Sequence, residues 1–291
     1  MKANAARTPV DATSGMQEPE GMNQDIELAI IGCGNMGGAI LDGMIAADGF
    51  PVERILVVER SAEIRSRCEQ TGIPATEALA DAREAKRILL AVKPQMFHEV
   101  AEGLGTLPRP TLVMSVMAGL SSKAIRKPLG EHARVVRTMP NTPCRIHAGI
   151  TAVAPGIGAT DEDLEQTEEI LATVGEVVRV REEEMYAVTA ISGSGPAYVF
   201  LLTEAWIDAA TNQGIDRATA ERLVRGTLQG ATALVAGEED PKSLRAAVTS
   251  KGGTTAAAIA ALEARGFRDA MNEAIEAATR RGIELDSEVA S

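Results

Sequence analysis

The stretch Ile30-Ile31-Gly32-Cys33-Gly34-Asn35-Met36-Gly37-Gly38 decides the fold of this chain. An apolar run over residues 26–31 leads into it, and a helical pattern over residues 39–47 follows it. A strand, a glycine turn and a helix in this order are typical of a dinucleotide site, where the helix N-terminus binds the pyrophosphate. We expect Gly32 to permit the tight turn, Gly34 to leave room for the pyrophosphate, and Gly37 to let helix and strand pack closely. A purely structural turn is the alternative, which the clear flanking strand and helix disfavour.

The composition limits the classes of partner. The chain has 291 residues, enough for two domains with their own cores. Its net charge of −12 disfavours nucleic acid and anionic membrane surfaces, whereas backbone N–H groups still allow an anionic substrate. Three cysteines without metal-ligand spacing predict no metal site, no disulfide framework and a cytoplasmic location. We expect no membrane-spanning helix, and a disordered polar tail over residues 1–24.

Strands alternate with helices up to about residue 181. This pattern predicts a doubly wound, Rossmann-type α/β domain over residues 25–181. Loops at the carboxyl ends of its strands face the ligand crevice, which places Lys93 near the cofactor, although a solvated loop lysine remains an alternative. Small residues over 117–120 let the nicotinamide half lie against the backbone. The turn at 138–143, bracketed by two prolines, is expected to expose amide and hydroxyl groups.

The residues after the second strand carry conflicting signals about the cofactor. Glu59 lies 22 residues beyond Gly37, where an acid binds the adenosine ribose and favours NAD. Arg60 and Ser61 instead favour the 2′-phosphate of NADP. We expect both cofactors to work, with NADPH modestly preferred.

From residue 182 to residue 291 every long segment is predicted to be helical. Ser194 is expected to cap a helix to about residue 213, Asp216 one to about residue 237, and Asp240 a third. A fourth helix follows Thr254, and a fifth is expected to end at Gly282. The abundance of Ala and Gly predicts close packing with a second subunit, and a dimer is favoured over a monomer.

A second glycine site interrupts these helices at Thr249-Ser250-Lys251-Gly252-Gly253-Thr254-Thr255. Hydroxyl groups flank the two glycines, and the N–H groups that start the next helix point into the same small volume. Such a group of donors suits a carboxylate, since each hydrogen bond to a charged group contributes about 1.5–3 kcal/mol. A flexible hinge is the alternative.

At this point the sequence resembles the pyrroline-5-carboxylate reductase family over about residues 26–283. Residues 241–263 match the family signature at Pro241, Leu244, Val248, Thr249, Ser250, Gly252, Gly253, Thr255, Ala258, Ile259, Leu262 and Glu263. Three further blocks in the family's order are Ala91-Val92-Lys93-Pro94, Met139-Pro140-Asn141-Thr142-Pro143 and Ile191-Ser192-Gly193-Ser194-Gly195-Pro196-Ala197-Tyr198. Lys251 departs from the family, which usually has proline there, and this puts the loop's stiffness and substrate affinity in doubt.

The resemblance implies hydride transfer from NAD(P)H to the imine carbon of 1-pyrroline-5-carboxylate, giving L-proline. It implies that Thr255 orients the imine and that Ser250, Gly253, Thr254 and Thr255 bind the substrate. The implied cofactor residues are Ile31, Gly32, Cys33, Gly34, Asn35, Met36, Gly37, Glu59, Arg60, Ala91, Val92, Lys93, Pro94, Val116, Met117, Ala118 and Asn141. In the family each site is shared across a homodimer, and higher assemblies of dimers occur.

Two rival functions use the same N-terminal motif. A hydroxy-acid dehydrogenase needs a lysine general acid on the domain-linking helix, and residues 182–214 contain no lysine. A cofactor-sensing protein without catalysis has no need of the second glycine site.

Overall fold

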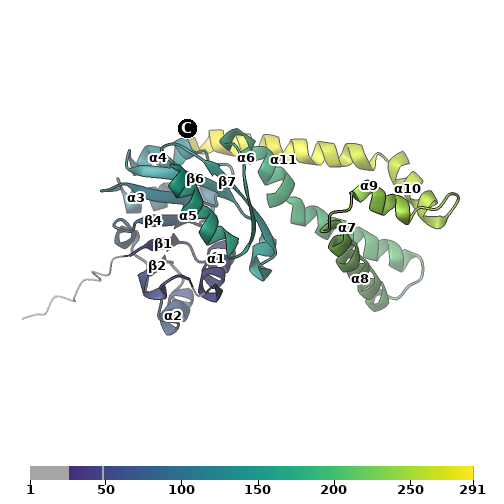
Figure 1. Ribbon diagram of the computed structural model, residues 1–291, viewed down its shortest axis with the longest axis horizontal. Helices are drawn as coiled ribbons and strands as arrows, with labels where there is room; N and C mark the ends of the chain where they lie inside the picture. The colour runs from purple at the N-terminus through teal and green to yellow at the C-terminus, as the bar shows by residue number, and fades with distance from the viewer. Residues whose placement is uncertain (1–25, 48, 291) are drawn as a thin grey trace, which may run out of the picture.

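Eight strands form one sheet in the order β3-β2-β1-β4-β5-β6-β7-β8 (Figure 1). The computed structural model describes residues 26–47 and 49–290, so the tail predicted for residues 1–24 lies outside the described residues. All neighbouring strands pair in parallel except β6 and β7, which are antiparallel. The strands are β1 (Leu28–Ile31), β2 (Ile55–Val58), β3 (Ala75–Thr76), β4 (Arg87–Leu90), β5 (Thr111–Ser115), β6 (Ala133–Met139), β7 (Gly149–Pro155) and β8 (Gly175–Arg179).

The strand order reverses at β1. From β1 the chain builds outward through β2 and β3 on one side, then returns to add β4 and the later strands on the other. In such sheets the ligand crevice lies outside the carboxyl ends of the two strands at the reversal, here β1 and β4.

Helices cover both faces of the sheet because the strand side chains are apolar on both faces. Leu28 and Ile30 of β1 belong to a core shared with α1 (Asn35–Ala46) and α5 (Asp161–Ala172). Ala29 and Ile31 belong to the opposite core, with α3 (Phe97–Leu104) and α4 (Ser122–Leu129). Each fully buried large aliphatic side chain contributes about 1.5–3 kcal/mol. The predicted doubly wound fold is confirmed.

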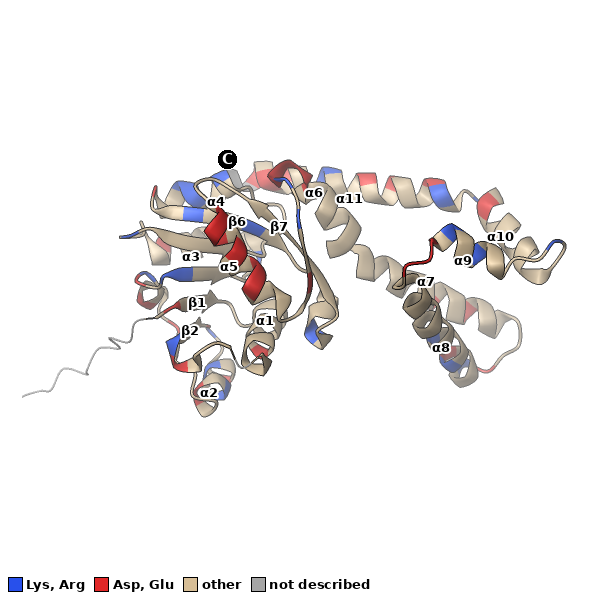
Figure 2. Ribbon diagram, viewed as in Figure 1, with Lys and Arg blue, Asp and Glu red and all other residues tan. Residues whose placement is uncertain are grey.

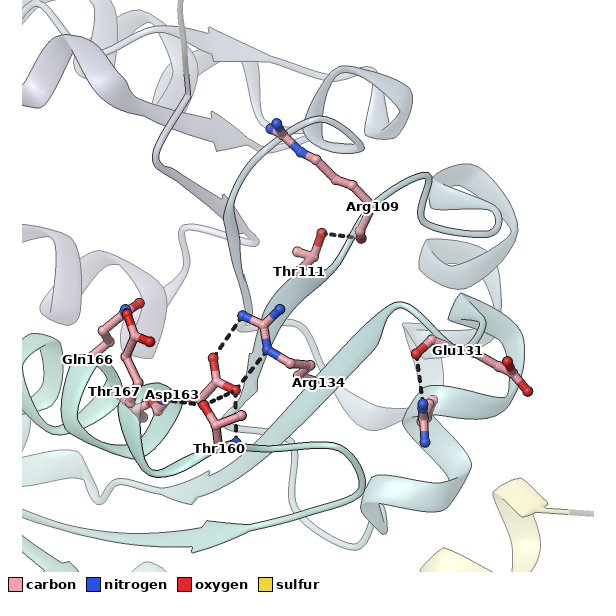
Figure 3. A network of polar contacts seen from close by, with 10 residues as sticks. Arg109, Thr111, Glu131, Arg134, Thr160, Asp163, Gln166 and Thr167 are labelled. Carbon is pink, nitrogen blue, oxygen red and sulfur yellow. Dashed lines mark hydrogen bonds and ion pairs between the residues drawn. The ribbon is translucent and has the colours of Figure 1, made fainter.

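Helix α5 begins with a polar network that fastens it to the sheet (Figure 3). Thr160 and Asp163 form a capping box, in which each side chain accepts the other's backbone N–H. Asp163 also accepts two hydrogen bonds from Arg134 of β6, at 2.8 and 2.9 Å. Burial opposes ionisation, but the bonds from Arg134 and Thr160 outweigh it and hold the pKa of Asp163 below its ordinary value.

The second half of the chain is helical, as predicted. Its helices are α6 (Met185–Val188), the π-helical turn η6 (Thr189–Gly193), α7 (Gly195–Asn212), α8 (Arg217–Val235), α9 (Pro241–Ala247), α10 (Thr254–Ala264) and α11 (Phe267–Ala290). Asp216 and Asp240 cap α8 and α9 through their side chains, which confirms those two helix starts.

Two predicted helix boundaries are wrong, the start at Ser194 and the end at Gly282. Ser194 makes no side-chain cap, because its backbone is itself helical and its N–H donates to the carbonyl of Thr189. The helical run therefore continues from α6 through η6 into α7. Gly282 does not end α11; it is buried within the helix against the ring of Tyr186, where a Cβ would lie 3.4 Å from Cδ1.

The helical region leaves the α/β domain and then returns to it. Figure 1 shows α7 to α10 extending away from the sheet, while α11 runs back along the top to reach α4 and α6. Helix α6 packs on the sheet, since Met185 shares a small core with Ala152 and Ala154 of β7. We propose that the boundary between the α/β domain and the helical domain lies between residues 181 and 182.

Candidate functional site

The glycine loop after β1 has the geometry that a dinucleotide requires. A Cβ added to Gly37 would lie 2.1 Å from the carbonyl oxygen of Gly32, so only glycine allows this approach of helix and strand. Gly34 has no heavy atom within 4 Å of a built Cβ and is exposed. It precedes α1 without any side-chain cap, so no cap side chain accepts the first N–H groups of that helix.

Glu59 braces this loop from the end of β2. Its carboxylate accepts the N–H of Cys33 at 2.8 Å and the N–H of Ser61 at 3.0 Å. The Cys33 N–H is thus already paired, while the Cys33 side chain lies in the core. Burial, with a smaller effect of Cys68, raises the pKa of Cys33 to about 12, so the thiol stays protonated.

Three cationic or hydrogen-bonding residues, Arg60, Ser61 and Arg65, gather after β2, where dinucleotide-binding folds of this type hold the adenosine ribose. Arg60 is exposed and forms an ion pair with Glu99 of α3. Ser61 caps α2 (Ala62–Gln70) by accepting the N–H of Ile64. The sequence prediction missed Arg65, whose guanidinium donates to the carbonyl oxygens of Glu59 and Arg60 at 2.7 and 2.8 Å. Its signal was a basic residue four positions after the Ser61 cap, one helical turn along.

The loops after β4 and β5 lie beside the glycine loop. A Cβ on Gly32 would meet the carbonyl oxygen of Ala91 and Cγ1 of Val92, each at 2.9 Å. The structure therefore brings residues 31–37 and 91–94 together, with Lys93 exposed. The loop after β5 follows closely, because the N–H of Val116 donates to the carbonyl of Leu90 at 3.1 Å.

The proline-bracketed turn after β6 differs from its prediction. Asn141 is buried and its side-chain oxygen accepts the N–H of Ile150 at 3.0 Å. The amide was expected to be exposed, but it holds the start of β7 against the turn. The same loop meets the helical region, where a Cβ on Gly193 would lie 2.6 Å from Cε of Met139.

The second glycine site sits at the start of α10. Gly252 has a φ of +74°, and Gly253 precedes α10 with no side-chain cap. The hydroxyl of Ser250 lies over this helix end, 2.4 Å from where a Cβ of Gly253 would be. The N–H groups of Thr254 and Thr255 open the helix, so this end offers backbone and hydroxyl donors to an anion.

The two glycine sites do not meet within one chain. Figure 1 places α9 and α10 at the far end of the helical region from the sheet. Helix α7 lies between the two glycine sites, and its exposed apolar side chains include Val199, Phe200, Leu201, Leu202 and Trp206. Residues 185–203 include no Lys, Arg, Asp or Glu, and the ribbon at the start of α7 is tan in Figure 2.

Among the described residues, one stretch, residues 182–212, is long and apolar enough by composition to cross a membrane, although the sequence led us to expect none. Only 11% of its most apolar window is buried within the chain. Length and composition alone are weak indications, and a helix covered by another protein surface passes the same test.

Together, the fold and the first glycine loop define a dinucleotide-binding α/β protein with a helical extension. The family described as pyrroline-5-carboxylate reductase dimerisation matches residues 182–285, and that described as NADP oxidoreductase, coenzyme F420-dependent, matches residues 27–119. The pyrroline-5-carboxylate reductase of Synechocystis sp. is 41% identical over 265 residues, covering 89% of this chain and 98% of its own.

Solved structures agree with these matches. The pyrroline-5-carboxylate reductase of Coxiella burnetii is 36% identical with a TM-score of 0.81, covering 90% of this chain and 99% of its own. The Plasmodium falciparum enzyme with NADP bound is 28% identical with a TM-score of 0.79, covering 90% and 98%. This chain belongs to the pyrroline-5-carboxylate reductase family.

Proposed function

We propose that this protein reduces 1-pyrroline-5-carboxylate to L-proline with NAD(P)H, the last step of proline biosynthesis. The observation that carries the proposal is the donor group at the start of α10, formed by Ser250, Gly253, Thr254 and Thr255. A cofactor-sensing protein has no use for this second site. The dinucleotide-binding loop and this anion-binding helix end together supply what a carboxylated imine and its reductant need.

The residues of the first loop fit a dinucleotide. The open space at Gly34 and the uncapped start of α1 suit a pyrophosphate. Glu59 keeps acceptor capacity for a ribose hydroxyl, while Arg60, Ser61 and Arg65 supply positive charge and donors for a 2′-phosphate. The remaining proposed contacts are Ile31, Gly32, Cys33, Asn35, Met36, Gly37, Ala91, Val92, Lys93, Pro94, Val116, Met117, Ala118 and Asn141.

The reaction depends more on aligning the imine with the cofactor than on acid catalysis by the protein. The cofactor supplies the hydride when bound. A protonated cyclic imine is already electrophilic, so the protein's task is to hold it by its carboxylate at the α10 N-terminus. We assign to the Thr255 hydroxyl the orientation of the ring through its nitrogen or carboxylate. Alignment of two reactants contributes on the order of 7–11 kcal/mol to lowering a barrier.

We further propose a homodimer with shared sites, with α10 of one subunit facing the glycine loop of its partner. The separation of the two glycine sites within one chain supports this arrangement. So does the uncovered apolar face of α7, since exposed contiguous apolar surface marks an interaction site. We propose a cytoplasmic location, which the three free, buried cysteines support.

Mixing two inactive variants tests function and sharing together. Gly34→Val removes the pyrophosphate space, and Thr255→Ala removes the orienting hydroxyl while leaving cofactor binding intact. If sites are shared, a mixed dimer has one intact site, and random mixing restores about a quarter of wild-type activity. The assay is NADPH oxidation with pyrroline-5-carboxylate.

The controls separate the two claims. A wild-type protein that does not oxidise NADPH or NADH with this substrate contradicts the function. Active wild type with no recovery on mixing contradicts sharing, provided that exchange of subunits is verified with differently tagged chains.

A further inference from the structure

Two carboxylates, one from each end of the helical region, accept hydrogen bonds from the start of α4. Glu182 lies where the chain leaves the α/β domain, and Asp286 lies in the last turns of α11, where it returns. Glu182 accepts the N–H and the hydroxyl of Ser122, both at 2.8 Å. Asp286 accepts the N–H of Ser121 at 2.7 Å. Both acids satisfy N–H groups at a helix start, where negative charge is favoured.

A tyrosine hydroxyl also donates a hydrogen bond to Asp286. The hydroxyl of Tyr186 in α6 donates to the second oxygen of Asp286 at 2.8 Å. The Tyr186 ring packs close to Gly282 of α11, and the guanidinium carbon of Arg137 lies 5.2 Å from the ring centroid. Arg137 is buried and pairs with Glu182 at 3.6 Å, which links the two carboxylates into one network.

The segment held by these two carboxylates directly continues residues 116–118, which we propose contact the nicotinamide half of the cofactor. Residues 116–118 follow β5, and Ser121 is three residues further on. Between them Gly119 has a φ of +69° and packs against α11, where a Cβ would lie 2.9 Å from Cβ of Leu285. Met117 and Leu120 are buried in the hydrophobic core. The loop is therefore held on one side by its core and on the other by α11.

We propose that Asp286, held by Tyr186, is a positioning residue that fixes the loop after β5 for hydride transfer. The inference rests on the proposed function. The last turns of α11 act on the reaction through Ser121 and Gly119, without touching substrate or cofactor. Releasing Asp286 frees the loop and misaligns the nicotinamide, while the glycine loop still binds the adenosine half.

A single-turnover experiment with enzyme in excess over NADPH tests this role. With folded enzyme saturating, misalignment lowers the first-order rate constant of NADPH oxidation, whereas a fraction of unfolded protein changes neither this rate constant nor the amplitude, which the limiting NADPH sets. For Asp286→Ala we expect a rate constant lowered about tenfold with full amplitude. Asp286→Asn keeps an oxygen for the Ser121 N–H and should recover part of the rate. Tyr186→Phe keeps the ring and removes only the donor, so its loss should be smaller than that of Asp286→Ala.

The control is Glu284→Gln, which removes an exposed acid of the same helix that pairs with Arg281 and should react at the wild-type rate. Affinity for 2′-phospho-ADP-ribose, which lacks the nicotinamide, should be unchanged in every variant. An Asp286→Ala protein that oxidises NADPH with the wild-type rate constant overturns the positioning role. Inactive wild type would instead overturn the proposed function.

Discussion

At the level of single residues, Glu59 combines two tasks. Its carboxylate accepts N–H groups from Cys33 and Ser61, so it shapes the glycine loop before any ribose is present. Each carboxylate oxygen has a second lone pair, which leaves it able to accept from a ribose hydroxyl. This capacity favours NAD, so the modest preference for NADPH that we propose depends on the neighbouring cations.

Arg60 and its partner Glu99 should shift cofactor choice in opposite directions. Arg60→Ala removes a cation from the proposed 2′-phosphate site and should lower kcat/KM with NADPH roughly fivefold, since the group is exposed and screened. Glu99→Gln frees Arg60 from its ion pair and should raise the preference for NADPH. The measurement is kcat/KM with NADPH and NADH for each variant. An unchanged ratio in both would show that Arg60 does not contact the phosphate.

Tyr186 should make the protein sensitive to strongly alkaline pH. Burial first, then its hydrogen bond and proximity to Asp286, raise the pKa of Tyr186 to about 12. A raised pKa in the folded state stabilises the protein below the unfolded value near 10, and that contribution is lost as pH rises from about 10 to about 12.

The chain has two tyrosines, so a Tyr198→Phe background isolates Tyr186. Its phenolate absorbance in the folded protein should appear near pH 12, and the melting temperature should fall over the same interval. A phenolate that forms near pH 10 while the protein remains folded would contradict the assignment.

At the level of elements, α5 depends on the pair of Asp163 with Arg134 (Figure 3). Asp163→Asn leaves Arg134 without its anion and weakens the capping box, so we expect a loss of about 3 kcal/mol in the free energy of unfolding. Because the pKa of Asp163 is lowered, the contribution is present at neutral pH and disappears as pH falls through the folded value.

Urea unfolding at neutral and at acidic pH measures this loss. Glu168→Gln on the same helix removes the more exposed pair with Arg179 and should cost no more than about 1 kcal/mol. Equal losses in the free energy of unfolding for the two variants at neutral pH would mean that the pair of Asp163 with Arg134 stabilises the protein no more than the exposed pair.

At the scale of the whole molecule, α7 exposes apolar side chains that we propose a second subunit buries. Phe200 is 59% exposed on α7, and Phe200→Asp should shift the protein from dimer to monomer because it places a charge in the proposed interface. Light scattering after gel filtration gives the mass. The matched control is Ile45→Asp, an exposed apolar residue on α1, which should remain dimeric. A monomeric wild type, or a Phe200→Asp protein that stays dimeric, would refute this interface.

The sequence alone determined the features that depend on residues a few positions apart. The glycine turn, the alternation of strands with helices, and the caps at Asp216 and Asp240 follow from local backbone chemistry, and the structure agrees. The family blocks are also local, and they sufficed to indicate the family.

Only the tertiary structure decided how distant segments pair. It buried the Asn141 amide, carried α11 through Gly282, and joined Ser121 to Asp286, which lies 165 residues away. Such contacts depend on how assembled layers and returning helices face each other, and no short window of sequence encodes this. The structure also placed the α10 site far from the glycine loop of its own chain, because α7 continues the helical run of α6, and the packing of α6 on the sheet directs that run.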